Sequence, residues 1–507
     1  MTVSQICILT VIILYLLFVL YLGIRFSKGN KTTEDYYLGG RKLGPVVTAM
    51  SAEASDMSSW LLLGIPGLAY AGGFADPFWT SLGLAVGTYL NWLIVASRLR
   101  KYSELNGSAT VPAFFSNRFG DDKNLLSLIS AIVIIVFFVP YTASGFSACG
   151  KLFKSLFGLD YMTSMIVFAL VIISYTALGG FLAASTSDLV QSIIMTIALA
   201  TILFYGANQA GGWAAVFDNA KSLQGYLDLN NTHLMESASS APYGTLTKIS
   251  TLAWGLGYFG MPHILLRFMA IEKKEKLTIS RRIASIWVVI AMFSAIIIGL
   301  VARAMTAEGV MPALDDPETA IIRISDILSR HGIFAACVAG LILAGILAAT
   351  MSTADSQLLA AASSASDDIF KKMLFKDMSE KTSMLIARGA VIIMSIIALV
   401  IASNPDSSVF QIVSFAWAGF GAAFGPLMLC ALFWKRTNKY GALAGMISGG
   451  AMIFIWKFLV RPIGGIWNIY ELLPGFIVSL IFIVAVSLLT PAPEGKIIED
   501  FEKASAK

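Results

Sequence analysis

The chain has 507 residues, of which 57% are hydrophobic and only 13% are charged, with a formal net charge of +5. Because soluble domains average about 25% charged residues, this composition excludes an ordinary soluble domain. Apolar runs of about 18 residues or more recur along the chain and indicate a helical membrane protein. The four cysteines are scattered through apolar segments without a CxxC pair, which argues against a metal or disulfide role.

The apolar runs predict about thirteen transmembrane helices in an all-α polytopic fold. The first run has no charge and no cleavage-type sequence after it, so we expect a retained helix and not a signal peptide. We expect one membrane domain over residues 1–507, with residues 491–507 as a cytoplasmic tail. The spans are predicted at 4–24, 45–71, 78–97, 124–148, 162–180, 188–208, 247–267, 283–303, 333–362, 384–402, 408–434, 441–460 and 470–490.

The orientation is predicted from the basic residues of the connecting loops. One set of alternate loops, which includes 98–123, 267–282 and the C-terminal tail, holds 27 of the 36 Lys and Arg residues. Cytoplasmic loops are enriched in Lys and Arg. The N-terminus is therefore expected outside and the C-terminus inside.

A polar stretch interrupts the second span. Residues 51–60 read SAEASDMSSW and place Glu53 and Asp56 at membrane depth, where ionisable groups are costly and usually functional. Gly64, Pro66 and Gly67 follow. This pattern predicts a broken helix, and transporters use the free carbonyls of such breaks to coordinate cations.

The ninth span contains a second polar group of residues. Ser352, Asp355 and Ser356 fall at i, i+3 and i+4, which places them on one helix face. Hydroxyls from this helix and carbonyls from a facing broken helix would supply the oxygen ligands that sodium needs. The alternative is that the hydroxyls bond back to carbonyls of their own helix.

The seventh span opens with Trp254 and Tyr258 among three glycines and a proline, which predicts a second broken helix. These two rings share a helix face and could wall a pocket for a small amphipathic solute. The alternative is aromatic packing or an interfacial belt. At the inner mouth of the sixth span, Asp188 is either a helix N-terminal carboxylate or part of an ion site. His263 is expected to be a structural histidine.

Breaks in the second and seventh spans are what two inverted five-helix repeats would produce, as in the LeuT-type fold. The first repeat is expected at about 45–208 and the second at about 247–434. The helices at 4–24, 441–460 and 470–490 would be additional.

Seven motifs make the chain resemble the sodium/solute symporter family over nearly its whole length, and its bacterial proline-transporting members most. The string WGLGYFGxPHIL at 254–265 is the most specific of them. The others are DYYLGGR at 35–41, SAxASDMSxW at 51–60, YxASG at 141–145, MSTxxxQLL at 351–359, WAGFGAAFGP at 417–426 and GALAGM at 441–446.

The resemblance implies two groups of binding residues. It implies a sodium site from backbone oxygens and two hydroxyls, contributed by Ala54, Met57, Ala349, Ser352 and Thr353. It implies that Asp56 is the carboxylate tied to sodium dependence and that Asp188 matches an aspartate of a second sodium site in some relatives. Asp56, Asp188, Asp355 and Ser356 are therefore expected either to support the sodium site or to form a second one. It implies a proline pocket among Ser58, Tyr141, Trp254, Tyr258 and Pro262.

The implied activity is sodium-coupled import of L-proline by alternating access across a bacterial cytoplasmic membrane. The expected coupling ion is Na⁺, with no organic cofactor, no nucleic-acid partner, no obligatory protein partner and no enzymatic activity. A symporter for another small amino acid or carboxylate is the alternative, and a channel is a further one. Glu53, Ser59 and Met261 depart from the residues usual in proline carriers, as Asp355 does from the hydroxyl usual in two-sodium relatives.

Overall fold

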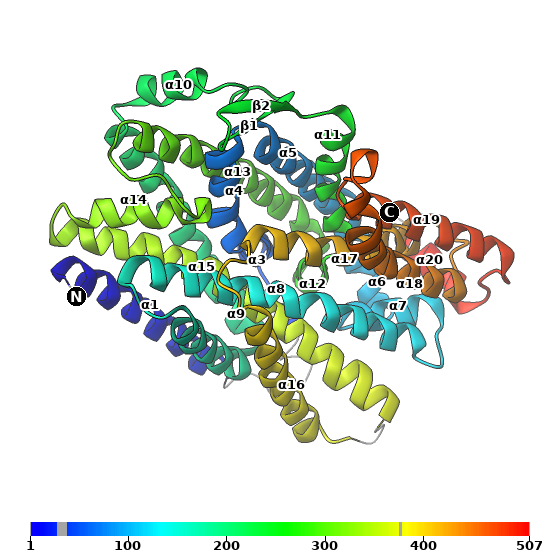
Figure 1. Ribbon diagram of the computed structural model, residues 1–507. Coiled ribbons are helices and arrows are strands. Elements are labelled where there is room, and N and C mark those ends of the chain that lie inside the picture. Colours follow the sequence, from blue (N-terminus) through cyan, green and yellow to red (C-terminus); the bar gives the residue numbers. More distant parts are fainter. Residues whose placement is uncertain (1, 28–37, 375–377, 506–507) are drawn as a thin grey trace.

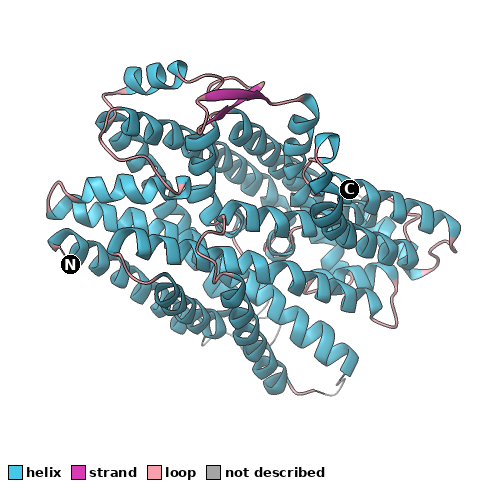
Figure 2. Cartoon of the chain, viewed as in Figure 1, coloured by secondary structure: helices cyan, strands magenta, loops and turns pink. Residues whose placement is uncertain are grey.

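The computed structural model describes residues 2–27, 38–374 and 378–505, and almost all of them lie in helices (Figure 2). The two β-strands in this part of the chain form one short antiparallel hairpin, and a single parallel bridge joins Leu43 to Ile271. The all-α architecture expected from the composition is therefore confirmed. Residues 35–37 of the first motif lie outside the described residues.

The first predicted break is present. Helix α3 (Pro45–Asp56) ends where Met57 leaves helical geometry, with φ −77° and ψ 71°. The chain turns helical again in a π-helical turn, η2 (Trp60–Gly64), which continues into α4 (Ile65–Gly72). The second span is therefore two half-helices joined through residues 57–59.

The second predicted break is also present. Helix α11 (Thr245–Leu252) tightens into a 3₁₀ segment, η4 (Ala253–Gly260), and α12 (Pro262–Ala270) begins after an extended Met261. The glycines of η4 allow close backbone approach to neighbours. A Cβ at Gly255 would lie 2.1 Å from the carbonyl oxygen of Gly83, a distance that no side chain tolerates.

The fifth and sixth spans meet without the loop that we expected between them. Two helices were expected at 162–180 and 188–208, and α9 (Tyr161–Gln209) contains two helical segments that meet at Gly180, where φ 67° and ψ −171° are not helical. Residues 181–187 are helical and belong to the second segment. The hydroxyl groups that follow the kink lie in a helix and not in a loop, and they donate to carbonyl groups of the preceding helical turn. Thr186 donates to the Leu182 carbonyl at 2.7 Å, and Ser187 donates to the Ala183 carbonyl at 2.9 Å.

The two ends of the bundle are defined by one continuous helix, which runs from Ala75 to Leu105 through α5 (Ala75–Leu90), η3 (Asn91–Val95) and α6 (Ala96–Leu105). Its 31 residues are enough to cross a bilayer, since each residue rises about 1.5 Å. Strand β1 (Asn231–Leu234) packs on α5, and the C-terminal helix α20 (Lys496–Ser505) packs on α6. We call these opposite ends the hairpin end and the tail end.

The two long loops of the sequence carry small elements. Residues 209–246 form α10 (Trp213–Ser222) and the hairpin of β1 with β2 (Ser239–Pro242), which lie together at the top of Figure 1. Residues 304–332 include the short helix α14 (Ala320–Ser329).

The remaining helices complete the bundle around the two broken ones. Helix α15 packs along α9 and α8, α17 packs against η4, and α18 pairs with α19. Their bounds are α1 (Val3–Ser27), η1 (Gly39–Arg41), α7 (Val111–Phe119), α8 (Leu125–Phe157), η5 (Lys274–Lys276), α13 (Leu277–Ala307), η6 (Pro317–Thr319), α15 (Ile333–Ser363), η7 (Ser364–Leu374), α16 (Glu380–Ile401), α17 (Val409–Phe433), α18 (Lys439–Ile455), η8 (Trp456–Val460), η9 (Arg461–Ile463), η10 (Gly465–Trp467) and α19 (Leu472–Leu489).

Ten helices among the described residues are long and apolar enough to cross a membrane. The broken spans fall outside this set, because interruption leaves only short apolar pieces such as Trp60–Gly72. The piece Tyr161–Ser174 of α9 is also too short to be included. The chain is a polytopic membrane protein, and the count of thirteen spans stays a prediction.

Candidate functional site

The break in the second span exposes backbone carbonyls at the centre of the bundle. The Asp56 carbonyl accepts from the indole Nε1 of Trp60 at 2.9 Å and from the Tyr141 hydroxyl at 3.3 Å. Tyr141 comes from α8, so the break lies directly against that helix. Aromatic donors therefore satisfy a carbonyl that the interrupted helix no longer pairs.

The residues expected to bind sodium converge on the same break. The Ser352 hydroxyl of α15 lies 2.7 Å from the Ala54 carbonyl oxygen and 3.0 Å from the Ala349 carbonyl oxygen. The Thr353 hydroxyl is buried, with no hydrogen-bond partner among the described residues. Met57 ends α3 three residues after Ala54. These neutral carbonyl and hydroxyl oxygens fit a monovalent cation held by an unwound helix.

Two carboxylates of α3 are buried beside these oxygens. The Tyr258 hydroxyl donates to Asp56 Oδ2, and the Trp92 indole Nε1 donates to Glu53 Oε1 at 3.1 Å. The other oxygens, Asp56 Oδ1 and Glu53 Oε2, have no partner among the described residues. Asp56 thus connects the break to Tyr258, which the resemblance places in the substrate pocket.

Trp254 and Tyr258 take part in a buried aromatic cluster. The Trp254 ring centroid lies 6.4 Å from that of Trp60 and 5.0 Å from that of Tyr470. The Trp417 indole Nε1 donates to the Trp254 carbonyl at 2.8 Å, and its ring lies edge-on to Tyr258 with centroids 5.0 Å apart. The aromatic-packing alternative therefore describes part of what these rings do in this conformation.

A crevice beside the break, with no room for a water molecule, is lined by sodium and substrate candidates together. Ser58, Tyr141 and Thr353 line it, and Trp254 and Tyr258 do not. Its other lining residues are Thr142, Ser144, Gly145, Thr350, Ala354 and Gln357. Two of the five predicted substrate residues and one predicted sodium residue thus face one space.

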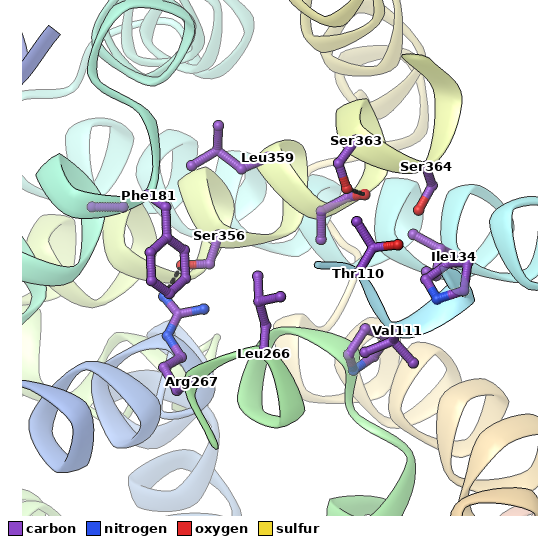
Figure 3. A pocket seen from close by; sticks show the side chains of 14 residues that line it. Thr110, Val111, Ile134, Phe181, Leu266, Arg267, Ser356, Leu359, Ser363 and Ser364 are labelled. Carbon is purple, nitrogen blue, oxygen red and sulfur yellow. Dashed lines mark hydrogen bonds between the residues drawn. The ribbon is translucent and has the colours of Figure 1, made fainter. Parts of the chain in front are cut away.

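Pro262 lies elsewhere, in a second cavity that Figure 3 shows between α12, α15 and α9. Arg267 and Ser356 line the same cavity, together with Phe181. Its lining also includes Thr110 and Val111 at the start of α7, the helix that packs against α20. The cavity is therefore on the tail-end side of the break.

Asp188 is the carboxylate of a buried ion pair. It is fully buried inside α9, so the helix N-terminal interpretation was wrong. Arg267 Nη2 lies 3.1 Å from Asp188 Oδ2, and both side chains are at most 1% exposed. Arg267 was counted among the charges of an inner loop, which was also wrong, because it lies within α12. A lone arginine in an apolar run was the signal available in the sequence.

Asp355 and Ser356 are buried on the same helix as the sodium candidates. Ser356 Oγ donates to Asp355 Oδ1 at 3.1 Å, and Ser356 Oγ lies 3.1 Å from Ser55 Oγ. His263 is buried, and its carbonyl accepts from Arg267 Nη1 at 2.8 Å.

A buried carboxylate that the sequence analysis missed connects a loop to α17 at the hairpin end. Glu318 accepts from Lys151 Nζ at 2.7 Å and from the Ser408 hydroxyl at 2.8 Å. It also accepts from the backbone N–H groups of Val409 and Phe410, each at 3.1 Å. These N–H groups belong to the first turn of α17, where helices leave donors unpaired. Nothing in the local sequence distinguished Glu318 from an exposed loop residue.

Comparison with known proteins identifies the family. The model of the Sodium:solute symporter family matches residues 36–449. A sodium/proline symporter of Staphylococcus aureus is 40% identical over 503 residues, covering 97% of this chain and 94% of that protein. The sodium/proline symporter of S. aureus strain USA300 / TCH1516 is also 40% identical, covering 98% and 94%.

Solved structures place the fold among LeuT-type transporters. A Na⁺-coupled sialic acid symporter in a substrate-bound outward-open state superposes with a TM-score of 0.78 at 18% identity, covering 96% of this chain and 99% of that one. MhsT in complex with L-phenylalanine gives a TM-score of 0.54 at 12% identity, covering 88% and 98%. These similarities support the LeuT-type fold expected from the paired breaks. The chain belongs to the sodium:solute symporter family.

Proposed function

We propose that the protein is a sodium-coupled symporter that imports L-proline by alternating access. The observation that carries the proposal is the contact of the Ser352 hydroxyl with the Ala54 carbonyl at 2.7 Å, which joins α15 to the break in the second span. The two relatives named above are sodium/proline symporters and match nearly the whole chain. That combination favours an ion-coupled carrier over an enzyme.

The proposed coupling follows from which groups share the break. The proposed sodium ligand Ala54 and the carboxylate of Asp56 lie two residues apart, and Asp56 accepts from the proposed substrate residue Tyr258. Sodium held by Ala54 and Ser352 would fix the end of α3, and thereby the orientation of Asp56 toward Tyr258. Each ligand would then favour binding of the other, because coupling free energy is reciprocal.

Proline suits the residues around the break. Its ring is apolar and compact, and its amine is cationic, so faces of Trp254 and Tyr258 offer both apolar contact and cation–π attraction. Both rings now pack within the aromatic cluster. Opening on the hairpin side would have to separate them from Trp60 and Trp417 before proline could bind between them.

The two ends of the bundle suggest how access alternates. At the hairpin end, Glu318 ties its loop to the first turn of α17, and Phe410 packs against Gly64 of η2. On the tail-end side, the cavity of Figure 3 reaches Pro262 and Ser356. Opening on the hairpin side, which we take to face outward, would have to break the contacts of Glu318 with α17 and of Phe410 with Gly64.

The available energy is sufficient with a single sodium ion. A membrane potential near 100 mV is worth about 2.3 kcal/mol per charge. A roughly tenfold sodium gradient adds about 1.4 kcal/mol. Together they would sustain a proline accumulation of several hundredfold.

The proposal includes the wider assignments made from the sequence. We place the protein in a bacterial cytoplasmic membrane as a single transport domain, with repeats at about 45–208 and 247–434 and with the C-terminus inside. Basic residues concentrated in one set of alternate loops support that orientation.

Uptake of labelled proline into proteoliposomes tests the proposal. An inward sodium gradient should drive accumulation above the external concentration, whereas a proton gradient or no gradient should not. Competition by a panel of amino acids and small carboxylates distinguishes proline from the alternative substrates. Uptake that merely equilibrates and does not saturate would indicate a channel, and strong inhibition by another solute alone would reassign the substrate.

A further inference from the structure

Arg267 occupies the position where a second sodium ion would be expected. The resemblance matches Asp188 to an aspartate of a second sodium site, Ser356 is a further candidate for that site, and both side chains contact this arginine. Arg267 Nη2 lies 3.1 Å from Asp188 Oδ2 and 2.6 Å from Ser356 Oγ. Figure 3 shows the guanidinium beneath the ring of Phe181 and linked to Ser356.

The remaining donors of the guanidinium also point at oxygens. Arg267 Nε donates to the Ser51 hydroxyl at 3.0 Å, and Nη1 donates to the His263 carbonyl at 2.8 Å. One carboxylate, two hydroxyls and one carbonyl therefore surround a single planar cation. These are the oxygen types that a sodium site would use, but the guanidinium already bonds each of them.

The network holds several helices in one buried cluster. Asp188 Oδ2 also accepts from Ser51 Oγ at 2.6 Å and from Ser55 Oγ at 3.1 Å, both on α3. Arg267 belongs to α12, Asp188 to α9 and Ser356 to α15. Arg267, Asp188 and Ser356 are each at most 4% exposed. A buried carboxylate is stabilised in its charged form by a positive partner, and here that partner is the Arg267 side chain of the protein itself.

We propose that Arg267 is a built-in cation that replaces a second sodium ion, so that one sodium ion accompanies each substrate molecule. The residues Asp188 and Ser356 therefore do not fit a sodium site in this chain. The ratio of sodium to substrate rests on the proposed function, whereas the replacement of the ion by Arg267 does not.

The direct test is the number of ²²Na⁺ ions bound per chain by purified protein in detergent, without added proline. The wild-type chain should bind one. Arg267→Gln removes the positive partner of the Asp188 carboxyl group, so this variant should bind a second sodium ion beside Asp188. The double variant Arg267→Gln with Asp188→Asn should return to one, because the carboxylate charge is gone.

Arg100→Gln is a matched control. Arg100 is also buried and pairs with a carboxylate, Glu104, at 2.8 Å, but this pair contacts none of the second-site residues. Its sodium count should stay at one. If Arg267→Gln does not fold, the charge-reversed pair Arg267→Asp with Asp188→Arg keeps one positive and one negative group and should bind one sodium ion.

Two results would overturn the inference. Two sodium ions bound by the wild-type chain would show that the guanidinium does not exclude the ion. The same count in Arg267→Gln and in its double variant would show that Asp188 recruits no cation. Binding of no sodium at all would instead refute the proposed function. In proteoliposomes, transport by the wild-type protein should move one elementary charge per proline molecule, because one sodium ion accompanies each neutral zwitterion.

Discussion

Replacing Ser352 by alanine removes one hydroxyl from the proposed sodium site and little else. The Ser352 hydroxyl contacts the carbonyl oxygens of Ala54 and Ala349, and its side chain is fully buried in α15. Alanine has a higher helix propensity than serine, so α15 should still form. The change therefore isolates the hydroxyl from the fold.

The expected loss of sodium-binding free energy is the cost of the substitution with the ion bound minus its cost without the ion. With the ion bound, loss of a hydroxyl that contacts a charge costs about 1.5–3 kcal/mol. Without the ion, loss of the neutral bond to Ala54 costs about 0.5–1.5 kcal/mol. The net loss on ion binding is therefore about 1–1.5 kcal/mol, and since about 1.4 kcal/mol is tenfold, apparent sodium affinity should fall roughly 5- to 12-fold.

The assay is proline uptake into proteoliposomes as a function of external sodium concentration. Half-maximal activation should shift to higher sodium, and the maximal rate should largely recover at saturating sodium. Ser395→Ala is the control: Ser395 is equally buried in α16, and its hydroxyl bonds back to the Val391 carbonyl at 2.8 Å. An unchanged sodium dependence in Ser352→Ala, with reduced maximal uptake, would place the ion elsewhere.

Three further sets of variants test the pocket, the second carboxylate and the close helix packing. Trp254→Ala and Tyr258→Ala should each raise the KM for proline about tenfold, because an aromatic contact is worth about 1.5 kcal/mol; substrate titration of uptake measures this. Glu53→Gln should keep the acceptor for the Trp92 indole and retain transport, whereas Glu53→Leu leaves that buried donor unpaired and should lower thermal stability by about 1–3 kcal/mol. Gly87→Ala should destabilise the protein by about 1–3 kcal/mol, because its Cβ would lie 2.3 Å from the Gly255 carbonyl oxygen.

Each set of variants has a result that would contradict the prediction. For the pocket, unaltered KM in both aromatic variants would refute the placement of proline. For Glu53, equal melting temperatures of the Gln and Leu variants would show that the Trp92 bond contributes nothing. For the packing, Gly389→Ala adds a methyl group to an open position of α16 and should not lower the melting temperature. Equal stability of the two glycine variants would contradict the close approach of α5 and η4.

Local sequence determined where the membrane helices break. Asp56 and Met57 lie in a polar stretch with Gly64 and Pro66 beyond it, and the glycines of 254–260 lead into Pro262. Both patterns act within one or two helical turns, through the backbone freedom of glycine and the missing N–H of proline. For this reason they could be interpreted correctly without knowledge of any neighbouring helix.

Contacts between distant segments were decided by the tertiary structure alone. Arg267 lies in an apolar run, residues 264–271, close to a basic loop, so the sequence alone does not decide between a loop charge and a buried cation. Arg267 is buried next to Asp188, which lies 79 positions away in the sequence. The ion pair with Asp188 offsets the free energy lost when the guanidinium leaves water. Glu318 similarly required α17 to supply its first-turn N–H groups.

The sequence by itself thus determined the membrane class, the two breaks and the family motifs, because hydropathy, helix breaking and motif spacing are local properties. Only the tertiary structure decided which oxygens converge on Ser352 and which cation faces Asp188. Which buried polar groups pair depends on which residues are neighbours in space. The local sequence around a polar residue does not distinguish between its possible partners in other helices. The physical reason is that burial fixes the requirement for a partner, and the packing of the helices selects which one.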